Sequence, residues 1–229
     1  MIDPPFTIEE FFGVFVAYNA AIWPLQIIAY LAGILAVASL WEKRLRANLI
    51  VPVVLALLWA CNAIGYHLMY FSTINPLAKS FAVFFMAQAI LFAFAAMFAK
   101  KLHFVLELNV RSAAGIALIV YALLIYPVLG IIAGHGLMAG PMFGVAPCPT
   151  TIFTIGILLL ARGNWVLWLS IIPGLWSLVG LAAALQLGIP EDLGLPVAGL
   201  LLLLALCFDT VRARQVQKRL TEHPRSAGQ

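Results

Sequence analysis

Long apolar segments alternate with short polar connections along almost the whole chain of 229 residues. A helix that crosses a bilayer needs about 20 consecutive, mainly apolar residues with few charges. Seven segments follow this pattern, at 16–40, 49–71, 81–99, 113–133, 149–162, 165–187 and 194–211. The pattern predicts an all-α fold, a polytopic membrane helical bundle with seven transmembrane helices. It places 1–229 in a single integral membrane domain that ends in a basic tail at 212–229.

Two local signals define the start of the first segment. Thr7 and Glu10 have the T-x-x-E spacing of a capping box, so the first helix is expected to begin near residue 8. Residues 11–16 are expected at the membrane interface, before the chain turns inward. Pro24 has no backbone N–H, and we expect it to kink this helix.

Composition agrees with a membrane protein, since 64% of the residues are hydrophobic and only 10% are charged. A soluble domain averages about 45–50% apolar and about 25% charged residues. The net charge of +4 comes from connections beside the membrane, so it does not indicate nucleic-acid binding. The three cysteines lack CxxC spacing, and their odd number argues against a disulfide framework. A cleavable signal peptide is not expected, because acidic residues occupy the place of its basic region.

The charged residues predict an orientation. Alternate connections, together with the tail, contain Lys43, Arg44, Arg46, Lys100, Lys101, Arg111, Arg162, Arg212, Arg214, Lys218, Arg219 and Arg225. The other connections contain Lys79 as their only Lys or Arg, and they carry the acids Asp3, Glu9, Glu10, Glu191 and Asp192. The positive-inside rule then places the N-terminus outside and the C-terminus in the cytoplasm.

The fifth segment, 149–162, is too short for a plain crossing helix. Its 14 residues make a helix of about 21 Å, against a hydrocarbon core of about 30 Å. A re-entrant hairpin would leave six spans and put the basic tail outside. We favour a true crossing, with the Gly/Pro-rich stretch 141–147 dipping in to cover the missing depth. Such a segment is typical of a transport site, although a loop that only packs on neighbouring helices fits equally well.

Polar and aromatic residues recur on one face of each of the first two segments. Positions 19, 23, 26 and 30 share a helical face, as do positions 59, 62, 66 and 70. These faces could line a ligand pocket in the outer half of the membrane, or they could hold the helices together as interhelical hydrogen-bond donors and acceptors. The candidate ligand-binding residues are Tyr18, Asn19, Gln26, Asn62, Tyr66, His67, Asn75, Cys148, Thr150 and Thr151.

Three chemical roles are open for the Pro-Cys-Pro stretch and its surroundings. His67 and Cys148 are donors that suit a soft metal ion, if the fold brings them together. With Pro149 in the first helical turn and Cys148 as N-cap, the N–H groups of 150–152 would be free to bind an anion. Alternatively, Cys148 is the reactive thiol of a redox enzyme, or simply a buried thiol.

Several activities lack their usual signals. Asp209 is the only acid within a segment, and Arg212 is its expected partner one helical turn on. The last segment contains no lysine, which excludes retinal bound as a Schiff base. P-loop, HExxH, GxSxG and CxxCH motifs are absent, so a nucleotide cofactor is not expected.

Three blocks resemble an uncharacterised bacterial family of multi-pass inner-membrane proteins, classed as a domain of unknown function. They are YNAAIWPLQ at 18–26, YHLMYFSTINP at 66–76 and FGVAPCPTTIFTIG at 143–156. The resemblance implies the bacterial inner membrane but no activity. Pro-Cys-Pro before an apolar helix is also similar to motifs of nickel/cobalt exporters and of thiol-reductant transporters, whose other motifs are missing here.

Taken together, the sequence favours a permease or another protein that handles a small solute or metal ion, with a polar pocket open to the periplasmic side. A membrane thiol or redox enzyme and a non-catalytic assembly subunit are the alternatives. The expected partners are the lipid bilayer and an unidentified small solute or ion. Homo-oligomerisation is left open by the sequence, and nucleic acid is not expected.

Overall fold

The computed structural model describes residues 5–41, 44–97 and 102–222, and it is almost entirely helical, as predicted. Its α-helices are α1 (Ile8–Ala21), α2 (Leu25–Ser39), α3 (Arg44–Cys61), α4 (Ala78–Met97), α5 (Val110–Val120), α6 (Tyr126–Ile132), α7 (Gly136–Ala139), α8 (Pro147–Leu160), α9 (Trp165–Leu187) and α10 (Gly194–Glu222). Several residues behind the predicted orientation, Asp3, Lys43, Lys100, Lys101 and Arg225, lie outside the described ranges.

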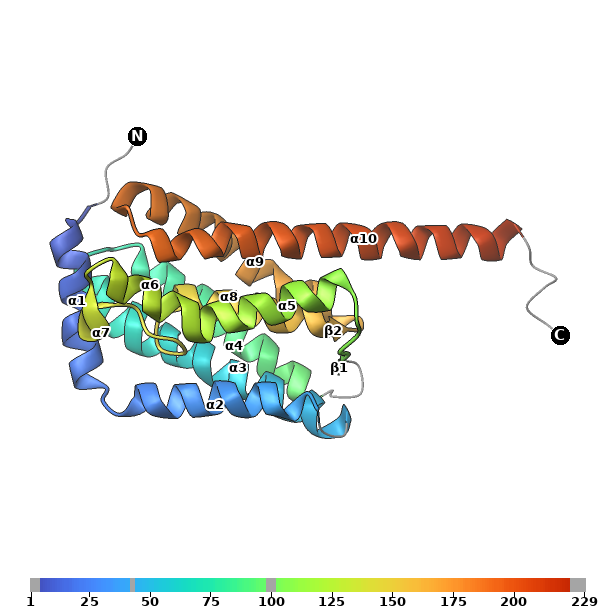
Figure 1. Cartoon of the computed structure of the whole chain (residues 1–229), viewed down its shortest axis with the longest axis horizontal. Coiled ribbons are helices and arrows are strands. Elements are labelled where there is room, and N and C mark those ends of the chain that lie inside the picture. Colours follow the sequence, from blue (N-terminus) through green and yellow to red (C-terminus); the bar gives the residue numbers. More distant parts are fainter. Residues whose placement is uncertain (1–4, 42–43, 98–101, 223–229) are drawn as a thin grey trace.

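Shorter elements extend or connect these helices. The π-helical segments η1 (Asn62–Tyr70) and η4 (Tyr121–Ile125) continue α3 and α5, and the 3₁₀ turns are η2 (Phe71–Thr73) and η5 (Pro190–Leu193). Strands β1 (His103–Phe104) and β2 (Ala161–Arg162) form one antiparallel pair. Most helices run along a common direction, while α1 lies across one end of the bundle and the β1–β2 pair marks the other (Figure 1). We call these the α1 end and the β end.

The first predicted segment, 16–40, is not one kinked helix. The chain turns by 86° between α1 and α2, so the residues before the turn belong to a helix that lies across the bundle. The turn includes Pro24, as expected, but it is much sharper than a proline kink. It is stabilised because Gln26 Nε2 donates to the Asn19 carbonyl, which lies near the end of α1, at 2.8 Å. The capping box of Thr7 and Glu10 is confirmed at the start of α1.

The number of helices that could cross a membrane is smaller than predicted. The described residues contain five helices that are long and apolar enough, or six if the bent pair α1–α2 counts as one span. The fifth predicted segment corresponds to α8, which is apolar but has only 14 residues. At the other extreme, α10 continues past the predicted boundary at residue 211 and projects beyond the bundle (Figure 1).

Helix α8 forms the centre of the bundle. Every residue of α8 except Cys148 is buried, mainly against α5, α9 and α10. The helix runs from the α1 end to the β end, where it leads directly into β2 (Figure 1). Gly115 of α5 and Gly156 of α8 permit the closest approach, because a Cβ on either glycine would lie 2.8 Å from the carbonyl oxygen of the other. The loop 140–146 before α8 is also largely buried, so the predicted dip leads into protein.

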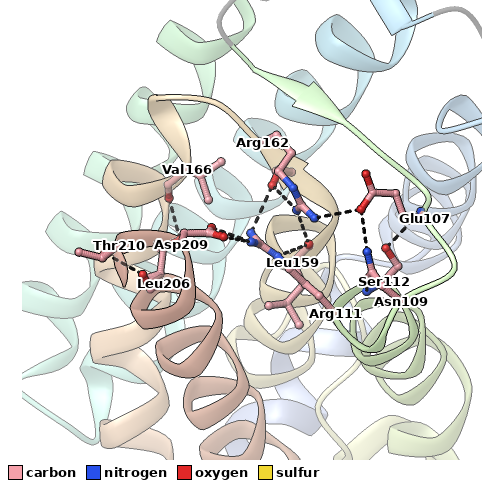
Figure 2. Close-up of polar contacts among 12 residues, drawn as sticks. Glu107, Asn109, Arg111, Ser112, Leu159, Arg162, Val166, Leu206, Asp209 and Thr210 are labelled. Carbon is pink, nitrogen blue, oxygen red and sulfur yellow. Dashed lines mark hydrogen bonds and ion pairs between the residues drawn. The ribbon is translucent and has the colours of Figure 1, made fainter. Parts of the chain in front are cut away.

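Arginine side chains satisfy the last carbonyl groups of α8 at the β end. Arg111 Nε donates to the Leu159 carbonyl at 2.8 Å, and Arg111 Nη2 reaches the Ala161 carbonyl at 3.3 Å (Figure 2). The Val105 N–H donates to the Leu160 carbonyl at 2.9 Å. Arg162 donates to the Leu159 and Ala161 carbonyls at 3.2 and 3.0 Å. Since the last carbonyls of a helix have no intrahelical partner, these contacts allow the helix end to be buried.

The partner of Asp209 differs from the predicted one. Both carboxylate oxygens of Asp209 accept from Arg111 Nη1, at 2.6 and 2.8 Å, so Arg111 and not Arg212 forms the ion pair (Figure 2). The α8 carbonyls already hold the Arg111 side chain in place. Arg212, by contrast, is exposed on α10, the helix that also carries Asp209. Partial burial and the nearby Arg111 lower the pKa of the Arg162 guanidinium.

We predict that Arg111→Met destabilises the protein much more than Asp209→Asn. The first change leaves buried carbonyls without a donor, at a cost of about 1–3 kcal/mol. The second weakens a half-exposed ion pair, and exposed pairs contribute about 0–1 kcal/mol. Thermal unfolding in detergent measures both variants. Equal losses for the two variants would contradict the carbonyl-capping role of Arg111.

Candidate functional site

A cavity of about 260 Å³ lies at the α1 end of the bundle. Its wall comes from residues 5 and 6, α1, η1, η2, α4, α8, α9, η5 and parts of the connecting loops, so residues distant in sequence meet there. The aromatic lining residues are Phe6, Phe11, Phe15, Tyr66, Phe71, Phe81 and Trp176. The polar lining residues are His67, Asn75, Cys148, Gln186 and Asp192. The cavity is therefore mainly apolar and rich in aromatic side chains, with a few polar groups set into its wall.

His67 lies in an aromatic box on one side of this cavity. Its ring centroid is 4.6 Å from that of Phe85, 5.3 Å from that of Trp176 and 5.8 Å from that of Phe81. The side chain is 0% exposed, and within the described ranges neither ring nitrogen has a hydrogen-bond partner. Contacts between an N–H group and an aromatic face are weak, so most of the hydrogen-bonding capacity of this imidazole is unused.

Two adjacent acids are buried beside the cavity, on the 3₁₀ turn η5. Asp192 is 2% exposed, lines the cavity, and accepts from the Tyr126 hydroxyl at 2.5 Å. The Cys148 thiol also interacts with the Asp192 carboxyl group as a hydrogen-bond partner. Glu191 lies next to it, with Oε1 2.9 Å from His135 Nδ1, while its Oε2 has no partner among the described residues.

The sequence analysis assigned Glu191 and Asp192 to an outer connection and did not predict that they are buried. The available signal was their place in a connection of six residues, 188–193, between two apolar segments. A connection this short keeps both side chains against the end of the bundle. Trp176 was also missed, and no pattern in the sequence distinguishes it from the other tryptophans.

The π-helical geometry of η1 changes which residues of the second segment face inward. An α-helical face predicted positions 62, 66 and 70 together, but η1 has one more residue between bonded groups. As a result, Tyr66 and His67 are both buried, whereas Tyr70 is partly exposed. Short π-helical segments are frequent at functional sites, because they re-aim side chains in this way.

The ten predicted site residues fall into separate groups. Four of them line the cavity, namely Tyr66, His67, Asn75 and Cys148. The hydroxyl group of Tyr18 lies 3.8 Å from the Cys61 sulfur, and its ring contacts Tyr66 and Tyr70. Thr151 is buried, and its hydroxyl group has no partner among the described residues.

Most of the remaining predicted residues hold backbone groups of the loop before α8. Asn19 Nδ2 donates to the Met138 and Gly140 carbonyls at 2.8 and 3.0 Å. Asn62 Nδ2 donates to the Gly144 carbonyl at 3.0 Å. The Gly144 N–H donates to Thr150 Oγ1 at 3.1 Å, and that hydroxyl donates to the Ala146 carbonyl at 2.6 Å. With Gln26 at the α1–α2 turn, these polar groups have the geometry of interhelical hydrogen bonds.

The predicted anion site at the start of α8 is wrong. Ala146 is the N-cap and Pro147 the first helical residue, so Cys148 is inside the helix. The Thr150 N–H already donates to the Ala146 carbonyl at 3.4 Å. Because Pro147 and Pro149 have no backbone N–H, Cys148 is the only one of the first three residues of α8 that carries one.

The structure gives limited support for a metal site. His67 and Cys148 line the same cavity, but no group of three His, Cys, Asp or Glu side chains able to hold a metal occurs within the described ranges. Cys61 contacts Tyr18, and Cys207 is exposed on α10, so the other thiols lie elsewhere.

Comparison with known protein families identifies the family of this chain. The profile of a family of unknown function, DUF6064, matches residues 8–218, which is nearly the whole chain. The chain belongs to this family. Nothing among curated proteins or solved structures matches the chain. The family carries no assigned activity, and this DUF6064 member is a helical protein with apolar helices able to span a membrane.

We predict that Asn62→Leu destabilises the protein by about 1–3 kcal/mol, because the buried Gly144 carbonyl loses a donor while the side-chain volume stays similar. The measurement is the thermal unfolding midpoint in detergent. Asn164→Leu is the matched control, since this asparagine is exposed and its side chain does not cap α9. A midpoint for Asn62→Leu equal to that of the control would contradict the anchoring role of Asn62.

Proposed function

We propose that this chain is a bacterial inner-membrane permease, which binds a small solute in the aromatic cavity and passes it across the bilayer. The observation that carries this proposal is the cavity itself, in which seven aromatic rings and five polar side chains meet from separate elements. Ligand sites are typically concave, mainly apolar and equipped with a few placed polar groups. The cavity is smaller than the range of about 300–1,000 Å³ that suits drug-sized ligands, so its solute is small.

Unpaired polar groups distinguish this cavity from a packing defect. Protein interiors are close-packed, and voids larger than a water molecule are few. Next to the cavity, both His67 ring nitrogens lack a hydrogen-bond partner among the described residues, and the Trp176 indole N–H has only the Cys148 thiol, a weak sulfur acceptor, near it. Leaving such groups buried and unpaired costs about 1–3 kcal/mol each. A solute with polar atoms would offset this cost.

The position of the cavity relative to α8 also supports transport. The irregular backbone of loop 140–146 and the short helix α8 meet beside the cavity, where Pro147 and Cys148 contribute to its wall. Discontinuous helices of this kind commonly form the binding sites of secondary transporters. With the N-terminus outside, the cavity would open to the periplasm.

The arrangement of thiols weighs against the alternative of a thiol or redox enzyme. A thiol–disulfide enzyme usually has a second cysteine nearby, whereas Cys61 lies beside the Tyr18 hydroxyl group and Cys207 is exposed on α10.

We predict that a screen of small metabolites against the purified protein identifies solutes that raise its unfolding temperature. Ala182→Trp, which adds a large side chain at the exposed rim of the cavity, should abolish each such shift, and uptake of the solute into proteoliposomes should fail in the same variant. Leu185→Trp places the same side chain on an exposed position of α9 and should leave both signals unchanged. If Ala182→Trp removes no solute effect, the cavity is not the binding site and the proposal fails.

We also predict the side from which the cavity is reached. In spheroplasts, a membrane-impermeant maleimide should label a variant that keeps only Cys148, since Cys148 lines the cavity at the α1 end. A variant that keeps only Cys207, near the β end of α10, should react only after the membrane is permeabilised. The reverse pattern would place the cavity on the cytoplasmic side and contradict the proposed orientation.

A further inference from the structure

We infer that the solute of this cavity is a small organic cation with an ammonium or quaternary ammonium group. This inference rests on the proposed function, since it names the class of solute for the same site. Three observations support it: the charge of the buried acids, the geometry of the aromatic walls, and the unpaired polar groups between them.

The buried acids have fewer positive partners than negative charges. Asp192 receives hydrogen bonds from the Tyr126 hydroxyl and the Cys148 thiol, and both donors are neutral. The one described basic side chain near the pair is His135, which contacts Glu191 directly and interacts with Asp192 only at longer range. A buried carboxylate without a positive partner is costly. A bound cation would supply the missing charge at the place where Asp192 meets the cavity.

Aromatic rings from several elements line the cavity. The rings of Phe81 and Trp176 lie 5.1 Å apart at 82°, and those of Phe11 and Phe71 lie 6.1 Å apart at 82°. In each pair the edge of one ring packs against the face of the other, and all four rings line the cavity. Aromatic cages bind quaternary ammonium groups, since each ring face attracts a cation by about 0.5–2 kcal/mol.

The unpaired groups point to a second, polar end of the solute. The Trp176 indole N–H has only the Cys148 thiol, a weak sulfur acceptor, near it in the described structure, and this side chain is more than nine-tenths buried in the cavity wall. His67 lies next to it in the same wall, without a partner among the described residues. A hydroxyl or carbonyl oxygen a few bonds from the ammonium group would accept from these donors.

Matched cationic and neutral probes test the inference. Choline and 3,3-dimethylbutan-1-ol have nearly the same shape, and so do butylammonium and butan-1-ol, but only the first of each pair is charged. Binding is measured by titration calorimetry on the purified full chain in detergent. We expect each cation to bind at least tenfold more tightly than its neutral counterpart. Equal affinities within both pairs would overturn the inference.

Two variants of the cavity wall and one control variant test whether choline binds in the cavity. Asp192→Asn should weaken choline binding at least tenfold, while Asp209→Asn, the same change at the β end, should leave it unaffected. Trp176→Leu removes an aromatic face but not the carboxylate, so it provides a second test if Asp192→Asn does not fold. Choline binding that survives in both site variants would contradict the inference.

The reactivity of Cys148 gives an independent measurement. Two methanethiosulfonate reagents, one with a trimethylammonium group and one with a sulfonate group, each convert a thiol into a mixed disulfide and release methanesulfinate. For each single-cysteine variant, the measured quantity is the rate of reaction with the cationic reagent divided by the rate with the anionic one. We expect this ratio to be at least tenfold higher for the variant with only Cys148 than for the variant with only Cys207. No such preference would contradict a cation-selective cavity.

The outcomes separate this inference from the proposed function. If neutral solutes bind as tightly as cations and Ala182→Trp abolishes their binding, the cavity is a solute site but the cationic class is wrong. If neither the metabolite screen nor the cationic probes reveal binding that depends on the cavity, both the inference and the proposed function fail.

Discussion

The structure depends on burying one helix, α8, from end to end. A helix leaves its first four N–H groups and its last four carbonyl groups without intrahelical partners, and burial makes each unpaired group costly. At the start of α8, Pro147 and Pro149 remove two of those N–H groups. At its end, Arg111 and Arg162 reach the final carbonyls from outside the helix. Both ends are thus compatible with an environment that excludes water.

The way in which the two ends of α8 are satisfied determines which residues lie at each end of the bundle. At the β end, Arg111 pairs with Asp209 while it binds the α8 carbonyls, so its charge is compensated. At the α1 end, the loop before α8 is buried, and Asn19 and Asn62 bind its carbonyl groups. The same turn places Cys148 against Asp192 on the cavity wall. The cavity therefore follows from the way in which the chain enters its central helix.

Much of the architecture could be predicted from the sequence, because helices and caps depend on local patterns. The capping box at Thr7 and the break near Pro24 are examples. The 86° turn was not predictable, since it depends on tertiary contacts such as that of Gln26. The partner of Asp209 was wrong for the same reason, because Arg111 is distant in sequence and was brought close by α8.

The candidate site was harder to predict than the fold. Polar residues that hydrogen-bond to backbone and polar residues that line the cavity look alike in the sequence. Asn62 and His67 are neighbours in η1, yet Asn62 binds loop backbone and His67 has no partner in the described structure. What separates them is whether the surrounding fold supplies a complementary group. Buried polar groups are normally paired, as at the β end, and unpaired ones need an explanation. Unpaired buried atoms also occur elsewhere in the described structure, for example in Asn48, Gln88 and Thr151, but two of the side chains that carry them, His67 and Trp176, line the cavity beside Asp192. A solute in the cavity can reach them there, and its polar atoms would pair with them.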